Sequence, residues 1–275
     1  MALATDQLER TVYAALAEDL GEGDVTTEAT IDEGTAGSAT LVVREAGVVC
    51  GLRIVETVFR ALDPEIVFEP LVDEGAFVDG GAVARVRGSK RAILTGERTA
   101  LNFLGRLSGI ATLTRRFVDA VAGTGVAILD TRKTTPGLRA LEKHAVFVGG
   151  GRNHRFGLDD GVLVKDNHLR AAGSVGEAVE RLRAVTDLPI EIECDTLAQV
   201  EQAVDAAAEA ILLDNMGTDE LRAAVALVDG RARLEASGGV TLETVRAIAE
   251  TGVDEISVGA LTHSARSLDV SLELQ

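Results

Sequence analysis

The feature that most constrains the fold is a repeat in the second half of the chain. Six short, apolar, β-rich runs occur there, and alanine-rich segments with helical periodicity lie between most of them. The last four runs start about 21 to 23 residues apart, which is the length of one strand–helix unit. The six runs are residues 126–130, 161–165, 189–193, 210–214, 232–237 and 255–259.

Apolar residues at successive positions within these runs indicate strands that are buried on both faces, as in a parallel sheet covered by helices. Repeated units of this length most simply close into a barrel, and a doubly wound open sheet is the alternative. We therefore expect an α/β fold with six parallel strands.

The first part of the chain has a different rhythm. Residues 6–18 have the spacing of an amphipathic helix, and residues 37–86 contain short β-rich pieces around a helix-like segment. Residues 92–123 then keep apolar positions three and four apart, which predicts one or two long helices. We expect an N-terminal α+β sandwich domain over residues 1–105 and a barrel domain over residues 106–275, with the last residues packing back on the first domain.

The chain is strongly acidic, with 44 Asp and Glu residues against 27 Lys and Arg and a net charge of −17. Such a surface repels nucleic acid and anionic membranes, so we expect neither as a partner. An acid-rich surface with few lysines is also typical of enzymes that work in concentrated salt, and we expect the protein to resist unfolding better in molar KCl.

No run of about 18 apolar residues occurs, and the first residues lack the apolar segment of a secretory signal. The two cysteines, Cys50 and Cys194, form no metal-binding or redox spacing. These observations predict a cytoplasmic protein with no membrane span.

Cations concentrate in residues 130–170. This window holds eight Lys or Arg against five Asp or Glu, so it is positive by three charges within an acidic chain. Three of the four lysines and three of the four histidines also lie in it. A solvated basic loop is the simpler explanation, but so large a local inversion of charge favours an anion-binding site.

Each predicted strand ends in a polar residue or a glycine. In parallel α/β folds the ligand binds at this end, because the loops there vary and helix N-termini point toward it. One such residue is often only a helix cap, but six of six indicate a site. The residues are Asp130, Lys165, Glu193, Asp214, Ser237 and Gly259.

The residue types at this end predict the chemistry of the site. Arginine presents a planar fork that suits a carboxylate or phosphate, and the cationic side comprises Arg132, Lys133, His154, Arg155 and Lys165. Glu193 and Asp214 end neighbouring strands and suit Mg²⁺ or a positive charge forming on the substrate.

Glycines in residues 235–240 and 257–262 let backbone N–H groups approach a phosphate. Three glycines begin residues 149–155, which predict a closing loop or a linker.

Several segments also carry a resemblance. GERTALNFLGRLSGIAT, DTRKTTPGLR, EKHAVFVGGGRNHRFGLDDGVLVKDNH, EIECDT, ILLDNM, EASGGV and VGALTHSA occur in this order between residues 96 and 265. They resemble the successive motifs of the quinolinate phosphoribosyltransferase family, and EDLGEGDVTT near the start resembles its N-terminal signature. The resemblance covers nearly the whole chain.

The resemblance implies a pentosyltransferase that converts quinolinate (pyridine-2,3-dicarboxylate) and phosphoribosyl pyrophosphate to nicotinate mononucleotide, carbon dioxide and pyrophosphate. It also implies Mg²⁺ as cofactor and a role in NAD biosynthesis. The implied fold is an incomplete α/β barrel of six strands after an N-terminal sandwich domain. The implied assembly is a homodimer in which the small domain of one chain covers the barrel mouth of the other, with higher homo-oligomers left open.

The resemblance also implies a role for individual residues. The quinolinate carboxylates would be held by Arg132, His154, Arg155 and Lys165, with Arg98 supplied by a partner subunit. Lys133 would lie between quinolinate and the pyrophosphate. Glu193 and Asp214 would bind the ribose hydroxyls and Mg²⁺ and stabilise the oxocarbenium-like ribose. The 5-phosphate would be held by Ser237, Gly238, Gly259 and His263.

Three alternatives stay open at this point. A related pyrophosphorylase that uses nicotinate, or one linked to molybdenum uptake, would have less use for so many cations. A noncatalytic barrel that binds a phosphorylated ligand has no use for Glu193 and Asp214, since carboxylates weaken anion binding. A zinc site of His144, His154 and His168 lacks ligand spacing and lies among cations.

Overall fold

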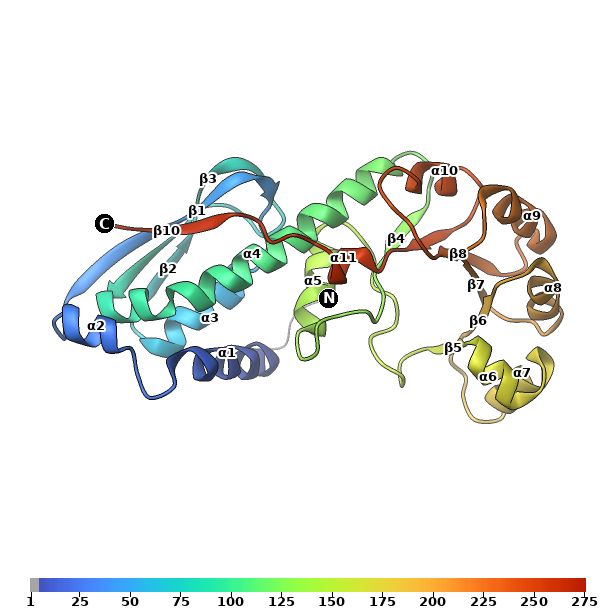
Figure 1. The fold of residues 1–275 in the computed structure, drawn as a ribbon, viewed down its shortest axis with the longest axis horizontal. Coiled ribbons are helices and arrows are strands. Elements are labelled where there is room, and N and C mark those ends of the chain that lie inside the picture. Colours follow the sequence, from blue (N-terminus) through green and yellow to red (C-terminus); the bar gives the residue numbers. More distant parts are fainter. Residues whose placement is uncertain (1–4) are drawn as a thin grey trace. The chain divides into compact units, whose positions relative to one another are not determined.

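The structure, a computed structural model, describes residues 5–275, which fold into two compact units (Figure 1). The first unit comprises residues 5–115, Thr134–Gly150 and Thr262–Gln275, and the second comprises Arg116–Lys133 and Gly151–Leu261. The chain thus passes between the units several times, whereas the sequence predicted one boundary between residues 105 and 106.

An antiparallel sheet with strand order β10-β1-β3-β2 forms the centre of the first unit. The long strands β1 (Ala36–Val48) and β3 (Phe77–Ser89) pair along most of their length. The short strand β2 (Val67–Pro70) extends one edge of the sheet, and β10 (Val270–Leu274) extends the other. The end of the chain therefore belongs to the N-terminal sheet.

Five helices complete the first unit. They are α1 (Thr5–Leu20), α2 (Val25–Thr30), α3 (Leu52–Leu62), α4 (Lys90–Ala120) and α5 (Arg139–Val148). Helix α1 buries Leu8, Val12 and Leu16, whose spacing of four residues places them on one face, and it contacts α3. The expected one or two long helices are a single helix, α4, whose last residues belong to the second unit.

The C-terminal segment crosses α4 at its glycines. A Cβ atom built on Gly109 would overlap the carbonyl oxygen of Arg266, so this crossing requires glycine. The backbone N–H of Leu268 donates to the carbonyl of Gly105 at 2.9 Å, which fixes the segment on the way to β10.

The second unit is a parallel sheet of six strands with the order β4-β9-β8-β7-β6-β5. The strands are β4 (Ala127–Leu129), β5 (Val162–Val164), β6 (Ile190–Cys194), β7 (Ala210–Asp214), β8 (Arg233–Ser237) and β9 (Glu255–Ser257). All six predicted strands are confirmed to within two residues at each end.

The pairing of β4 with β9 joins the first strand of this sheet to the last, as in a barrel. Between β4 and β5 the ladder is broken, and only an isolated bridge joins Leu129 to Arg152. The expected incomplete barrel of six strands is therefore confirmed.

Helices follow the strands of the second unit. They are α6 (Asp166–Ala172), α7 (Val175–Arg183), α8 (Leu197–Asp205), α9 (Thr218–Val228), α10 (Val245–Ala249) and α11 (Ala260–His263). Side chains cap several of them: Ser174 accepts a hydrogen bond from the Glu177 N–H, and Thr196 and Gln199 form a capping box. None of the helices described within residues 5–275 is long and apolar enough to cross a membrane.

Candidate active site

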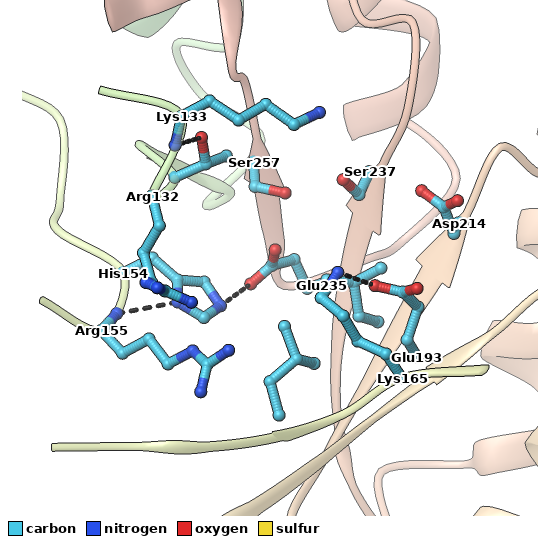
Figure 2. A pocket seen from close by; sticks show the side chains of 13 residues that line it. Arg132, Lys133, His154, Arg155, Lys165, Glu193, Asp214, Glu235, Ser237 and Ser257 are labelled. Atoms are coloured by element: carbon cyan, nitrogen blue, oxygen red, sulfur yellow. Dashed lines mark hydrogen bonds and ion pairs between the residues drawn. The ribbon is translucent and has the colours of Figure 1, made fainter. Parts of the chain in front are cut away.

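A cavity of about 400 Å³ opens at the carboxyl ends of the parallel strands (Figure 2). Most of the predicted site residues line it, namely Arg132, Lys133, His154, Arg155, Lys165, Glu193, Asp214 and Ser237. The other lining residues are Thr131, Leu163, Leu212, Glu235 and Ser257. All of them belong to the second unit, so this unit by itself builds the cationic and acidic sides of the site.

The alternation of side chains along each strand explains which residues reach the cavity. Along β6, Ile190, Ile192 and Cys194 point to one face of the sheet and are completely buried. Glu191 and Glu193 therefore share the other face, and Glu193 lines the cavity. The same two-residue step in β8 places Glu235 and Ser237 there together.

Arg132 and Lys133 follow β4 on one wall of the cavity. Figure 2 shows Arg132 running toward His154, whereas Lys133 extends in another direction. The backbone N–H of Lys133 donates to the Thr131 hydroxyl at 3.1 Å, which holds the turn between the two side chains. Arg132 and Lys133 are thus neighbours in sequence, but their side chains line two different parts of the cavity.

The segment after Gly151 is held against β4. The N–H of Arg152 donates to the carbonyl of Ile128 at 2.8 Å. The carboxylate of Asp130, which is fully buried, accepts from the Asn153 side chain at 2.7 Å and from the His154 N–H at 2.9 Å. Asp130 therefore positions the residues that carry His154 and Arg155.

Arg155 faces the same cavity as Arg132. Burial, followed by the charge of Arg132, lowers the pKa of the Arg155 guanidinium, and the carboxylates of Glu191 and Asp160 oppose this effect. One of its nitrogens, Nη1, donates to the carbonyl of Gly161 at 3.0 Å. Two guanidinium groups close enough to repel each other form a site that an anionic ligand stabilises.

His154 makes a contact through each ring nitrogen. Its Nδ1 accepts a hydrogen bond of 2.8 Å from the backbone N–H of Arg155. Its Nε2 lies 3.0 Å from Oε2 of Glu191. The same nitrogen lies 3.5 Å from Oε2 of Glu235 (Figure 2). The imidazole therefore holds the backbone N–H of Arg155 with one nitrogen and faces two acidic side chains with the other.

The acidic side of the cavity is formed by β6 and β7. Lys165 Nζ pairs with Oε2 of Glu193 at 2.6 Å, so this lysine has to change partner if it binds a substrate carboxylate. Asp214 accepts a hydrogen bond of 2.7 Å from the side chain of Asn215. Carboxylate oxygens on neighbouring strands that line one cavity are suitable Mg²⁺ ligands.

The turn after β8 depends on glycine. Gly238 has a φ of +97°, and a Cβ atom there would overlap the side chain of Asn215. The backbone N–H of Asn215 donates to the carbonyl of Ser237 at 2.9 Å, which joins this turn to the end of β7. Gly259 lies in the corresponding turn after β9. Both glycines thus occur where the sequence analysis expected a phosphate-binding turn.

The remaining predicted residues belong to the first unit. Arg98 is exposed on α4, and His263 is exposed at the end of α11, with its Nδ1 2.6 Å from the Ser264 hydroxyl. The histidines of the zinc alternative have separate contacts: His144 lies near Glu74, and His168 Nδ1 accepts from the Lys165 N–H.

Comparison with known proteins decides between the families considered above. Residues 24–108 match the family model of the quinolinate phosphoribosyl transferase N-terminal domain, and residues 110–273 match that of the C-terminal domain. The chain belongs to the quinolinate phosphoribosyltransferase family. A probable carboxylating nicotinate-nucleotide pyrophosphorylase of Synechocystis sp. is 47% identical over 94% of this chain and 90% of its own length.

Two further relatives agree with this result. The carboxylating nicotinate-nucleotide pyrophosphorylase of Mycobacterium leprae is 46% identical over 98% of both chains. The crystal structure of NadC from Streptococcus pyogenes superimposes with a TM-score of 0.96 at 41% identity, over 100% of this chain and 99% of that one. Both domains of the quinolinate phosphoribosyltransferase fold are therefore present in the chain.

Some residues that line or support this quinolinate phosphoribosyltransferase cavity were not predicted from sequence. Glu191 and Glu235 lie two residues before predicted site residues on the same strands, so the two-residue alternation was a signal that could have found them. Asn153 and Asn215 gave no such signal, since only the fold brings them to Asp130 and to the Gly238 turn.

Proposed function

We propose that the cavity at the carboxyl ends of β4–β9 is where this chain transfers the phosphoribosyl group of phosphoribosyl pyrophosphate to quinolinate, with loss of carbon dioxide. The product is nicotinate mononucleotide, a precursor in NAD biosynthesis. The observation that carries the proposal is that one cavity combines Arg132, Lys133, Arg155 and Lys165 with the carboxylates of Glu193 and Asp214. A dianionic acid and a polyphosphate need such cations, and a developing ribosyl cation needs such carboxylates.

The cationic wall is the proposed quinolinate site. Arg132 and Arg155 each present a planar fork to a carboxylate, and Lys165 adds a charge once it leaves Glu193. His154 was expected to bind a carboxylate directly. Since both of its ring nitrogens face the protein here, its proposed role is to hold Arg155. Arg98 of a partner subunit would bind the same substrate, as the family resemblance implies.

The opposite wall is the proposed site of the phosphorylated ribose. Glu193 and Asp214 would hold the ribose hydroxyls and Mg²⁺, which when bound neutralises the pyrophosphate charge. Lys133 lines the same cavity but extends in another direction than Arg132, and it would contact the departing pyrophosphate. The turns containing Ser237, Gly238 and Gly259 supply N–H groups for the 5-phosphate, with His263 as a further partner.

The residues act mainly by position and charge. The two carboxylates stabilise the oxocarbenium-like ribose as its bond to pyrophosphate breaks and its bond to the pyridine nitrogen forms. The ribosylated ring nitrogen is cationic, so it stabilises the electron pair that stays on ring carbon C2 when the 2-carboxylate leaves as carbon dioxide. C2 then takes up a proton from the solvent, which completes nicotinate mononucleotide. Arg132 and Arg155 have to orient the ring for this step and keep it from water.

The substrate assignment is tested by carbon dioxide release. The purified protein, mixed with phosphoribosyl pyrophosphate and Mg²⁺, is expected to release carbon dioxide from quinolinate and form a mononucleotide, and to show little turnover of nicotinate. Nicotinate has one carboxylate and so leaves part of the cationic wall unpaired. Turnover of nicotinate without turnover of quinolinate would support the related pyrophosphorylase instead, and ligand binding without turnover would support a noncatalytic barrel.

The metal assignment is tested by chelation together with substitution. EDTA is expected to abolish turnover and added Mg²⁺ to restore it. Asp214→Asn removes a charged ligand, so it is expected to raise the Mg²⁺ concentration needed for half-maximal rate and to lower kcat about 100-fold (about 3 kcal/mol). Asp219→Asn, at an exposed position on α9, is the control and is expected to leave both values unchanged. An unchanged Mg²⁺ requirement in Asp214→Asn would show that this carboxylate is not a ligand.

Three further properties belong to the proposal. The enzyme acts as a homodimer in which each chain supplies Arg98 to the other, since Arg98 is exposed on its own chain. It acts in the cytoplasm, where the two free, buried cysteines, Cys50 and Cys194, stay reduced. Its net charge of −17 suits a solution of concentrated salt, where repulsion among surface carboxylates is screened.

A further inference from the structure

Below the cationic wall, two buried carboxyl groups face one imidazole. Glu235 is 1% exposed and Glu191 is 6% exposed, and both lie close to His154 Nε2. Neither oxygen of Glu235 has a hydrogen-bond partner of ordinary geometry among the described residues, and neither has Oε1 of Glu191. Buried carboxylate oxygens without hydrogen-bond partners are costly, so the charge of an ionised Glu235 would have to be compensated by a proton or a cation.

The hydrogen bonds of His154 decide between these two possibilities. Its Nδ1 accepts from the Arg155 N–H at 2.8 Å, so Nδ1 carries no proton. The single proton of a neutral imidazole is then on Nε2, where it is donated to Glu191 at 3.0 Å. A metal ion would need the lone pair of Nε2 and would have to displace this proton. His154, Glu191 and Glu235 could surround an ion, but this tautomer opposes one.

The charges around Glu235 favour a proton on this residue. Glu191 receives the Nε2–H bond, whereas Glu235 lies 3.5 Å from the same nitrogen and receives no such bond. Burial, and next the charge of Glu191, raise the pKa of Glu235 to about 7, although the charge of His154 and the Ser257 side chain oppose this rise. The groups that face it are His154, Glu191, Ser257 and Glu255, with the cations Arg132, Arg155 and Lys165 around the same cavity.

We propose that Glu235 is a positioning residue that works as a neutral carboxylic acid beneath His154, and that quinolinate binds to the enzyme form in which Glu235 holds its proton. The inference rests on the proposed use of this cavity for quinolinate. A protonated Glu235 lets Glu191 alone hold the imidazole, which in turn holds the backbone of Arg155. An ionised Glu235 adds a negative charge at the floor of a cavity that has to accept a dianion.

The test is the pH dependence of quinolinate KM in the whole enzyme. In the wild type, KM is expected to be constant below about pH 7 and to rise about tenfold for each further pH unit, because the binding form is lost as Glu235 ionises. The KM of phosphoribosyl pyrophosphate is expected to lack this rise. Glu235→Gln is neutral at every pH and has the same shape, so its quinolinate KM is expected to stay at the low-pH value throughout.

Glu250→Gln, which removes an exposed carboxylate paired with Arg246, is the matched control and is expected to follow the wild-type profile. A parallel rise of KM in the wild type and in Glu235→Gln would overturn the proposal, since another group would then be titrating. A wild-type KM that does not change with pH would overturn it as well.

A second measurement needs no substrate. The ligand-free wild type is expected to show the infrared carbonyl band of a protonated carboxyl group, which disappears as the pH rises through about 7 and is absent from Glu235→Gln. Absence of this band in the wild type would overturn the proposal even if the variant fails to fold. The band could also titrate as expected in an enzyme that does not turn over quinolinate. This result would support a proton on Glu235 but would overturn quinolinate as the proposed substrate.

Discussion

Replacing Arg155 by alanine is expected to raise the KM for quinolinate about 100-fold, or about 3 kcal/mol of binding free energy, with little change in the KM for phosphoribosyl pyrophosphate. Arg155 lies on the wall opposite to Glu193 and Asp214, and its Nη1 donates to the carbonyl of Gly161 at 3.0 Å. Its loss would leave one carboxylate of the bound dianion without a fork to pair with. Steady-state kinetics with each substrate varied in turn would measure both constants.

Two further variants make this result specific. Arg155→Lys keeps the charge but loses the planar fork, so its quinolinate KM is expected to lie between those of the wild type and Arg155→Ala. Arg222→Ala removes an arginine that is 54% exposed on α9 and is paired with Asp219, and it is expected to change neither KM. Equal losses for the two substrates in Arg155→Ala would show that this residue does not belong to the quinolinate site alone.

Replacing Arg106 by alanine is expected to lower the free energy of unfolding by about 3 to 5 kcal/mol. Arg106 on α4 pairs at 2.7 Å with the carboxylate of Glu142 on α5, which is fully buried. It also donates to the carbonyl oxygens of Thr262 and Ala265 in the C-terminal segment. The variant would leave a buried carboxylate without its cation, and this is the costliest way to break an ion pair.

Urea unfolding, followed by circular dichroism, would measure the loss. Arg10→Ala breaks an exposed pair with Asp6 in the same unit and is expected to cost less than about 1 kcal/mol. The double variant Arg106→Met, Glu142→Leu removes both charges and is expected to be more stable than Arg106→Ala, although Thr135 loses the acceptor of its N–H and hydroxyl. Similar losses for Arg106→Ala and Arg10→Ala would mean that the buried pair does not stabilise the first unit.

Local pattern was enough to predict most of the fold. The six barrel strands and the helix at residues 52–62 are predicted by runs and spacings of apolar residues, because burial requires these patterns whatever the partner. Strand β10 was not predicted. Its five residues alternate only weakly, and they form a strand because β1 offers them an edge more than 200 residues earlier in the chain. Helices α2 and α5 were not predicted for other reasons. Helix α2 has only six residues, and the buried positions of α5 include the charged residues Glu142 and Lys143, which a search for apolar spacing passes over.

The parallel α/β architecture, and the cations and carboxylates at one end of its strands, can be read from the amino-acid sequence. Both follow from a repeated strand–helix unit, since the unit decides which end of each strand faces the ligand. The contacts that each of these side chains makes depend on the tertiary structure. Arg132 and Lys133 extend in different directions, and Lys165 pairs with Glu193. Both ring nitrogens of His154 contact the protein, one at the backbone of Arg155 and the other at Glu191 and Glu235. These contacts join residues from different strands and loops. The pattern of residues within one segment does not say how close its side chains lie to those of another segment, so such contacts could not be predicted from the sequence.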